Sequence, residues 1–229
     1  MAARNTSDEE RVAGRARPER DLSDELRDVV RTRVLRAARK VLAERGLATT
    51  VDEVAVAAGV SRRTVFRHFT TREQLFADAI RDGLRSYAGH LPRAERGTDI
   101  EEWLTEILVA AHRLNAKNGR IYWELHALGP ELEGELAAVA AERRAGRDRF
   151  VERVCGNAWK QSGGAGKPPD WLLDAFAIHL SAFATQALIG DFGRSSEEAG
   201  RSSAKVLLAS LEVALRERAG RSGRRPGSR

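Results

Sequence analysis

The feature that most constrains the fold is a pair of short helical segments that meet at Gly59. The first segment, residues 51–58, has apolar side chains at helical spacing. Thr50 and Glu53 form the sequence pattern of a capping box at its start. Glycine adopts the left-handed backbone of a sharp turn without a steric penalty, so Gly59 is expected to end this helix and redirect the chain.

The second segment follows the turn directly, and Ser61 is a suitable N-cap for it. Val65 and Phe69 lie four residues apart and share one apolar face, which leaves the Arg and Thr side chains between them on the outside. Two short helices joined by a glycine turn, the second basic outside and apolar inside, predict a helix-turn-helix. Such a unit places its second helix in the major groove of DNA.

The run from Thr49 to Phe76 resembles the DNA-binding domain of TetR-family transcriptional regulators, and the resemblance extends over roughly residues 27–85. Phe66 stands where the family usually has Tyr, so a phenolic hydroxyl contact to phosphate is missing. Arg63 adds a long donor at a position that is often small. The positions that carry the resemblance are Gly46, Thr49, Thr50, Val51, Val54, Ala55, Ala58, Gly59, Val60, Ser61, Thr64, Phe66, His68, Phe69, Arg72, Glu73 and Leu75.

This resemblance implies two sets of contacts with double-stranded operator DNA. Arginine suits the O6/N7 edge of guanine, and the residues expected to read bases are Arg62, Arg63, Thr64 and Arg67. Phosphate contacts position a protein on the duplex without specifying a sequence. The residues expected to make them are Thr50, Ser61, Phe66, His68 and Arg72.

We expect an all-α fold with an N-terminal three-helix helix-turn-helix DNA-binding domain, followed by a helical ligand-binding and dimerisation domain. A long first helix is predicted from about Leu22 to Arg45, and a helix capped by Thr71 and Gln74 is predicted to join the two domains. The expected boundaries are a disordered basic arm at 1–21, the DNA-binding domain at 22–88, a linker at 90–98, the body at 99–219 and a disordered basic tail at 220–229.

The body is predicted to contain helices at about 103–114, 121–128, 131–160, 170–189 and 195–218. Segment 170–189 is apolar nearly all round, so it must be buried on most sides. By the resemblance, the last two helices pair with those of a second subunit as a four-helix bundle, with Leu211 on the inward stripe. We therefore expect a homodimer; the alternative is that both helices complete a monomeric core.

A TetR-like body also implies a cavity for a small-molecule effector, which the aromatic content suggests is mainly apolar or aromatic. The candidate lining residues are Trp103, Trp123, His126, Phe150, Phe176, His179 and Phe183, although aromatics at helical spacing are also typical of plain core. The predicted function is a repressor that an effector releases from a palindromic operator. The alternative is an effector-independent, architectural DNA-binding protein with the same head.

Other functional classes find little support. We see no nucleophilic-serine elbow, paired-histidine zinc helix or carboxylate cluster, so we expect no enzyme, no metal and no cofactor. The GGAGKPP run at 163–169 lacks the spacing of a phosphate-binding loop, and the single Cys155 reads as a buried, inert thiol. No apolar run approaches ~20 residues. With a net charge of +6 and no signal-peptide pattern, the expected location is cytoplasmic and nucleoid-associated, without membrane contact.

Overall fold

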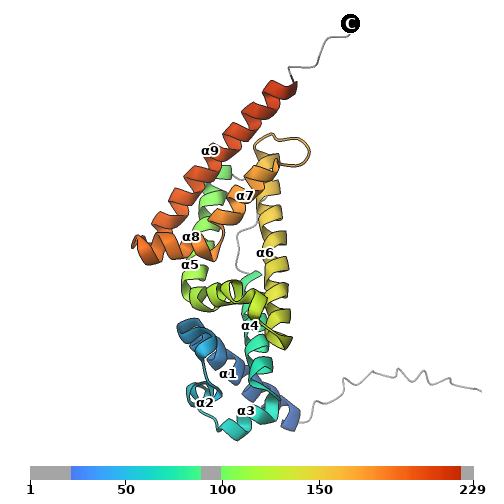
Figure 1. Ribbon diagram of the computed structural model, residues 1–229, viewed down its shortest axis with the longest axis vertical. Coiled ribbons are helices and arrows are strands. Elements are labelled where there is room, and N and C mark those ends of the chain that lie inside the picture. Colours follow the sequence, from blue (N-terminus) through green and yellow to red (C-terminus); the bar gives the residue numbers. More distant parts are fainter. Residues whose placement is uncertain (1–21, 89–98, 223–229) are drawn as a thin grey trace, which may run out of the picture.

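Figure 1 shows the computed structural model of the chain, which describes residues 22–88 and 99–222. The predicted arm at 1–21, the linker at 90–98 and residues 223–229 of the tail lie outside the described residues. Every regular element within the described ranges is helical, which confirms the all-α prediction. The last helix runs to Ser222, so it takes up the first three residues assigned to the tail.

The N-terminal domain, or head, is built from α1 (Leu22–Arg45), α2 (Val51–Ala58), α3 (Arg62–His68) and α4 (Arg72–Ala88). α1 has the predicted bounds and packs its buried stripe against α2 and α4. Thr71 caps α4, because its Oγ1 accepts the Gln74 N–H at 3.1 Å. The Gln74 side chain reaches back to the Thr70 N–H at 2.7 Å, one residue earlier than a capping box requires.

The body contains α5 (Ile100–Ala127), α6 (Gly134–Gln161), α7 (Asp170–His179), α8 (Ala182–Thr185) and α9 (Ser196–Ser222). A short 3₁₀ turn, Gly129–Glu131, links α5 to α6. α5 crosses the body and packs most extensively against α9. The head lies at one end of the molecule and α9 extends at the other (Figure 1).

The two helices predicted at 103–114 and 121–128 form one continuous helix, α5. The polar run between them does not interrupt it, because Lys117 and Arg120 lie on its exposed face. Asn115 and Ile121 are buried on the other face, so the inward stripe continues through the region. The predicted break was therefore wrong.

The single helix predicted at 170–189 is also wrong, because the chain bends by 47° between α7 and the segment Ala182–Asp191. The Ser181 hydroxyl donates to the Ile178 carbonyl at 2.6 Å and accepts the Ala184 N–H at 3.2 Å, so it starts a new helix. Residues Gln186–Asp191 then form a π-helical turn. Buried hydroxyls that bond to the local backbone compete with a continuous helix, which explains the bend.

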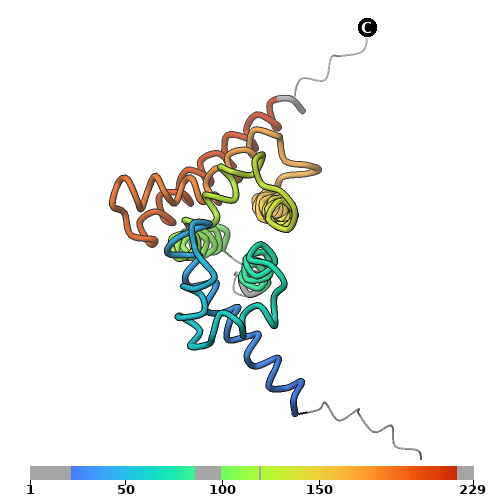
Figure 2. The backbone as a smooth tube through the Cα atoms, turned by 60° about the horizontal axis from the view of Figure 1, so that its bottom comes forward, coloured from blue at the N-terminus to red at the C-terminus, as the bar shows by residue number. Residues whose placement is uncertain are grey.

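Two hydrophobic clusters form the core. The first joins the head to the near ends of α5 and α6, where Ile121, Tyr122 and Val139 pack with head residues. Figure 2 shows α4 and α6 nearly end-on and side by side at this junction. The second cluster fills the body between α5, α6, α7 and α9. Because the first cluster spans both domains, the head is packed directly onto the body.

Several apolar side chains of α7 and α9 are not covered within one subunit. Ile178 is 62% exposed, and Val206 and Val213 are 48% and 46% exposed. Leu211, in contrast, is only 2% exposed and lies in the second cluster. The prediction that Leu211 faces a second subunit was therefore wrong, because one helix has two apolar faces and Leu211 occupies the inner one.

Within residues 22–88 and 99–222, no single helix is both long and apolar enough to cross a membrane. Asp170–His179 and Ala182–Asp191 reach that length and composition only when they are combined across the 47° bend.

Candidate nucleic-acid interface

The turn between α2 and α3 has the geometry that the sequence predicts. Thr50 Oγ1 accepts the Glu53 N–H at 3.3 Å, and the Glu53 carboxylate accepts the Thr50 N–H at 2.8 Å, so both halves of the capping box are present. Gly59 ends α2 with φ 63° and ψ 40°, in the left-handed region. The Ser61 hydroxyl then accepts the Thr64 N–H at 3.1 Å and starts α3.

α3 has one buried and one exposed face. Val65 and Phe69 are each 1% exposed and pack in the core of the head. The predicted base-reading residues Arg62, Arg63 and Arg67 are exposed on the opposite face. Thr64 is only half exposed, and its hydroxyl lies 2.9 Å from the hydroxyl of Ser61. α3 therefore presents three guanidinium groups to solvent.

Arg62 is engaged by an acidic neighbour in this structure. Its Nη1 donates to Asp52 Oδ2 at 2.7 Å, and its guanidinium lies 5.3 Å from the centroid of the Phe66 ring. Both members of the ion pair are well exposed, so the pair adds little to stability and can exchange for a phosphate or a base edge. Arg63 and Arg67 have no hydrogen bond or ion pair within the residues that the structure describes.

The predicted phosphate contacts fall into different environments. Thr50 and Ser61 are exposed and serve as helix caps, and Phe66 is 38% exposed. The Nε2 atom of His68 is buried and has no partner in the described part of the chain. Burial, followed by the charges of Arg67, Arg31 and Arg27, lowers the pKa of His68, so the ring is neutral near pH 7.

Arg72, the first residue of α4, bonds to the protein backbone. Its Nε and Nη2 both donate to the Thr49 carbonyl at 3.2 Å, and Nη2 also donates to the carbonyl of Leu47. The guanidinium lies 4.5 Å from the centroid of the Phe76 ring. Arg72 therefore ties the start of α4 to the backbone that precedes α2. Its phosphate contact stays a prediction that no observation here tests.

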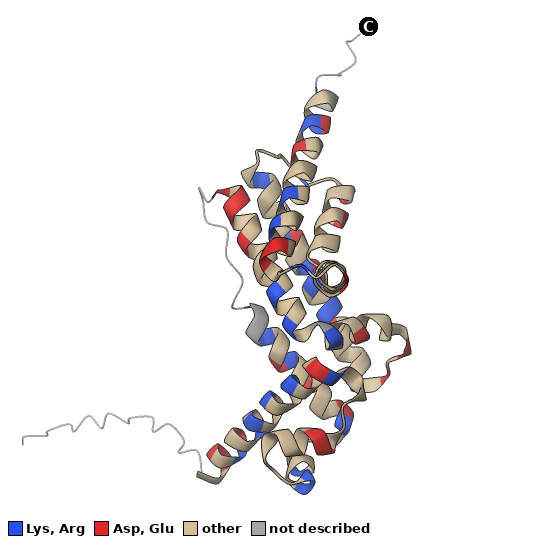
Figure 3. Ribbon diagram, turned by 90° about the vertical axis from the view of Figure 1, so that its left-hand side faces the viewer, with Lys and Arg blue, Asp and Glu red and all other residues tan. Residues whose placement is uncertain are grey.

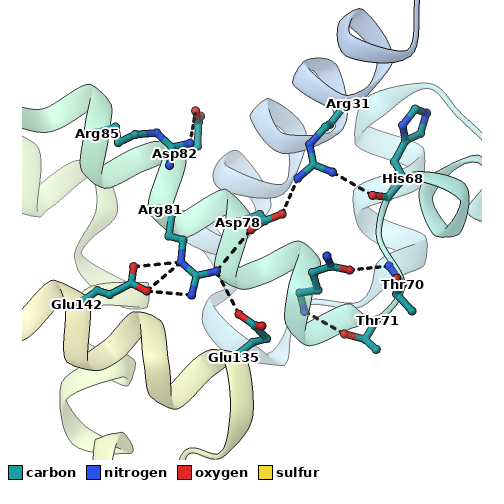
Figure 4. A network of polar contacts seen from close by, with 11 residues as sticks. Arg31, His68, Thr70, Thr71, Asp78, Arg81, Asp82, Arg85, Glu135 and Glu142 are labelled. Carbon is teal, nitrogen blue, oxygen red and sulfur yellow. Dashed lines mark hydrogen bonds and ion pairs between the residues drawn. The ribbon is translucent and has the colours of Figure 1, made fainter. Parts of the chain in front are cut away.

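A network of charged side chains connects the end of α3 to the body (Figure 4). Arg31 of α1 donates to the His68 carbonyl at 3.0 Å and to Asp78 of α4 at 2.6 Å. Arg81 of α4 lies 3.5 Å from the other Asp78 oxygen. Arg81 in turn contacts Glu135 at 3.1 Å and Glu142 at 3.0 Å, and both of these residues belong to α6.

We call this set the α4 network, comprising Arg31, Asp78, Arg81, Glu135 and Glu142. The hydrogen bonds and charges of Glu142 and Glu135 raise the pKa of Arg81, and burial lowers it. The carboxylates have the larger effect, so the pKa of Arg81 lies above the usual range of arginine. The same contact lowers the pKa of Glu142. Both groups are therefore charged over the physiological pH range. The network was not predicted from the sequence, because residues that contact one another in it are up to 61 positions apart.

A second contact joins α5 to the start of the helix-turn-helix. The Glu124 carboxylate accepts the Leu47 N–H and lies 3.1 Å from Arg120. It also packs directly against Gly46, where a Cβ atom would overlap the carboxylate. The head is thus held to the body by polar contacts at two places, one on α6 and one on α5.

The predicted effector residues do not form one group. Trp103, Phe150 and Phe176 are buried in the body core. Trp123 and His126 of α5 both contact Phe183 of α8, with ring centroids 4.7 Å and 4.6 Å apart in edge-to-face geometry. We call these three residues the aromatic cluster; all three are exposed to solvent on one side.

His179 belongs to a separate, buried polar group. Its Nδ1 lies 3.2 Å from the Ser203 hydroxyl, which also lies 3.1 Å from Nε2 of His112. His112 Nδ1 lies 2.8 Å from the Thr185 hydroxyl. Burial, together with the charge of His179, lowers the pKa of His112 to about 4. These contacts bond both ring nitrogens of the buried His112, whereas His179 is only partly buried and bonds through Nδ1.

Charge on the head is mixed. Figure 3 shows that Lys and Arg residues alternate with Asp and Glu residues along α1 and the neighbouring helices. Among the residues described here, no group of three or more His, Cys, Asp or Glu side chains is arranged to hold a metal ion. Exposed arginines suit a polyanion, and α3 presents three of them.

Comparison with known proteins agrees with this geometry. Residues 34–79 match the family model of bacterial regulatory proteins of the tetR family. An HTH-type transcriptional regulator of Bacillus subtilis (strain 168), YdeS, described as uncharacterised, is 29% identical over 105 residues, or 45% of this chain. The match spans about half of that relative, 51% of its length.

Two solved structures share the fold over most of the chain. A tetR-family transcriptional regulator from Streptomyces coelicolor has a TM-score of 0.62 and 18% identity, covering 83% of each chain. The fatty acid degradation regulator FadR from Bacillus halodurans has a TM-score of 0.59 and 17% identity, covering 78% of this chain and 94% of its own. At these identities the likeness establishes the fold of the body as well as that of the head.

Proposed function

The chain belongs to the TetR family of bacterial transcriptional regulators, and on that premise we propose that it is a repressor that binds a palindromic operator as a homodimer. The observation that carries the proposal is the exposed face of α3, where Arg62, Arg63 and Arg67 project from a helix fixed by buried Val65 and Phe69. A rigid helix with outward arginines is suited to reading guanine edges in the major groove. Thr50, Ser61, Phe66 and His68 surround that face and are proposed to contact the phosphates.

The experiment starts from a random pool of DNA duplexes, from which the protein selects its own binding sequence. Affinities for the selected duplex and a scrambled one are then compared at one salt concentration. The Arg63→Ala variant is expected to lose about 1–3 kcal/mol of binding free energy on the selected duplex and little on the scrambled one. Arg149→Ala, an exposed arginine on α6, is the matched control and should bind like the wild type. Failure of the pool to converge on any sequence would refute specific DNA binding.

The proposed dimer rests on the apolar side chains that one subunit leaves uncovered on α7 and α9. Ile178 and Val213 are about half exposed or more, which is costly unless a second copy covers them. Ile178→Glu and Val213→Glu should each give a folded monomer in light scattering, because a charge there must be desolvated in the interface. Val29→Glu, on the exposed face of α1, should leave the molecular mass unchanged. A wild-type monomer at micromolar concentration would contradict this part of the proposal.

Release from DNA is proposed to begin at the aromatic cluster. Trp123 and His126 flank Glu124 on one turn of α5, and Glu124 accepts the Leu47 N–H at the start of the helix-turn-helix. An apolar or aromatic effector that binds at the cluster and moves this turn would therefore tilt the head. The operator affinity would fall by the ratio of effector affinities for the two orientations.

The test is a thermal-shift screen of apolar and aromatic small molecules, followed by operator binding in the presence of each hit. A genuine effector should weaken operator binding by the wild type. It should not change operator binding by the Trp123→Ala or Phe183→Ala variant. Phe192→Ala, which is 71% exposed and outside the cluster, is the control. If no molecule that binds the body alters operator affinity, the alternative of an effector-independent DNA-binding protein is favoured instead.

A further inference from the structure

The body contains an open cleft of about 160 Å³ at the end away from the head. Its lining residues come from the end of α6, the loop that joins α6 to α7 and the last turns of α9. Figure 1 shows these three segments at one end of the body. We call it the distal cleft, and its lining residues are Trp159, Lys167, Pro169, Ala214, Glu217 and Arg218. None of these residues belongs to the aromatic cluster or to the exposed face of α3.

The distal cleft carries two cations, Lys167 and Arg218. Lys167 and Arg218 are exposed, and neither makes an ion pair or a hydrogen bond within residues 22–88 and 99–222. Glu217 contributes one negative charge, so the lining has a formal charge of +1. An anion placed between Lys167 and Arg218 would accept charge-assisted hydrogen bonds from both side chains.

Trp159 adds an uncharged donor. Its side chain is 1% exposed, and its indole N–H has no hydrogen-bond partner in the described part of the chain. Buried N–H groups are almost always paired in folded proteins, because an unpaired one forfeits the hydrogen bond that water gave it. Trp159 is also a lining residue of the distal cleft, so we take its unpaired indole N–H as the uncharged donor of the proposed site.

The loop itself is built to lie close to the indole. The Gly164 N–H donates to the Trp159 carbonyl at 2.8 Å, and a Cβ atom at Gly164 would lie only 2.6 Å from Nε1. Only glycine permits this approach without displacing the ring. The GGAGKPP run lacks the spacing of a nucleotide-binding loop. In this structure it places Gly164 against the indole ring of Trp159 and Lys167 in the lining of the distal cleft.

We propose that the distal cleft binds a small oxyanion, such as phosphate or a short carboxylate, through Trp159, Lys167 and Arg218. The volume corresponds to about five water molecules, which is well below the roughly 300–1,000 Å³ of pockets for larger ligands. All three polar groups are donors, and the ionised oxygens of an oxyanion are acceptors. Bound there, the anion connects the α6–α7 loop to α9, at the opposite end of the body from the α4 network.

The test uses inorganic phosphate and acetate as two separate probes, each titrated into the full-length, isotope-labelled protein at constant ionic strength. The readout is the indole N–H resonance of Trp159, assigned by its loss in Trp159→Phe. We expect a saturable shift of that resonance at millimolar anion. Lys167→Met and Arg218→Met should each weaken binding about two- to fivefold, the effect of one lost exposed charge contact. Glu217→Gln should strengthen binding.

Matched controls are Lys205→Met and Arg216→Met, exposed cations of α9 that do not line the cleft. They should bind both anions like the wild type. A stronger response to phosphate than to acetate would identify a tetrahedral ligand, and the reverse a carboxylate. Absence of a saturable shift with either probe, or equal losses in the controls, would overturn the proposal. Operator binding by the Lys167→Met variant is measured as well. Because Lys167 lies outside the exposed face of α3, this variant should bind the operator like the wild type even when it has lost affinity for the anion.

Discussion

The contact between Arg81 and Glu142 yields the most quantitative prediction, because it joins α4 to α6 by a bidentate ion pair. Arg81 Nε and Nη2 each lie 3.0 Å from a Glu142 oxygen. The side chains are 24% and 51% exposed, so solvent screens the attraction in part. A fully exposed pair is worth about 0.2–1 kcal/mol and a charged hydrogen bond about 1.5–3 kcal/mol, which places this pair at about 1–1.5 kcal/mol.

A double-mutant cycle measures that value directly. Arg81→Met, Glu142→Gln and the double variant are unfolded in urea, and the coupling free energy is the part of the two losses that does not add. Glu135→Gln supplies a comparison, because Glu135 makes one contact to Arg81 at 3.1 Å and should couple more weakly. High salt should reduce both coupling energies.

The pair also has a definite dependence on pH. The pKa of Glu142 is lowered in the folded state, first by its hydrogen bonds to Arg81. Its contribution is therefore complete above the unfolded pKa near 4.5 and is lost as the pH falls through the folded value. A coupling energy below about 0.3 kcal/mol at neutral pH would refute the claim that this pair fixes α4 against the body.

Three further predictions concern other groups. Asp52→Asn should tighten binding to all duplexes by about two- to threefold, because it frees Arg62 and removes a charge that repels phosphate; unchanged affinity would contradict this. Because the pKa of His112 is lowered to about 4, its contribution to the free energy of unfolding should be complete above about pH 6.5 and decrease by ~3 kcal/mol as the pH drops to 4. Urea titrations at several pH values should therefore show a steeper loss of stability with falling pH for the wild type than for His112→Asn. Equal pH dependence in the two proteins would contradict this. Burial raises the pKa of the Cys155 thiol to about 11, so a thiol reagent should react only with the unfolded chain; rapid labelling of native protein would show otherwise.

Features decided within one or two turns of helix were predictable from the sequence. The Thr50–Glu53 capping box, the left-handed Gly59 and the Ser61 cap each depend on residues no more than four positions apart. The division of α3 into an apolar and a basic face follows from the same short spacing. These local features determine the helix-turn-helix, which is why the head could be predicted from its residues.

Features that depend on distant partners could not be predicted in this way. The bend at Ser181 arises because its hydroxyl bonds to the local backbone, and a stretch of apolar residues does not reveal that choice. Leu211 could not be assigned to the core or to an interface, because apolar spacing identifies a face but not its partner. The backbone contacts of Arg72 were not predicted, because its Nε and Nη2 atoms bind carbonyls 23 and 25 residues earlier in the chain.

The hydrophobic cluster shared by the head and the body has a consequence for protein engineering. Ile121 and Tyr122 of α5 pack with head residues, so this surface of α5 and α6 completes the hydrophobic core of the head. A hybrid regulator made by joining this head to another body at residues 89–98 would place foreign side chains against that surface. Successful recombination should therefore transplant Ile121, Tyr122, Leu125, Leu136, Val139 and Ala140 together with the head.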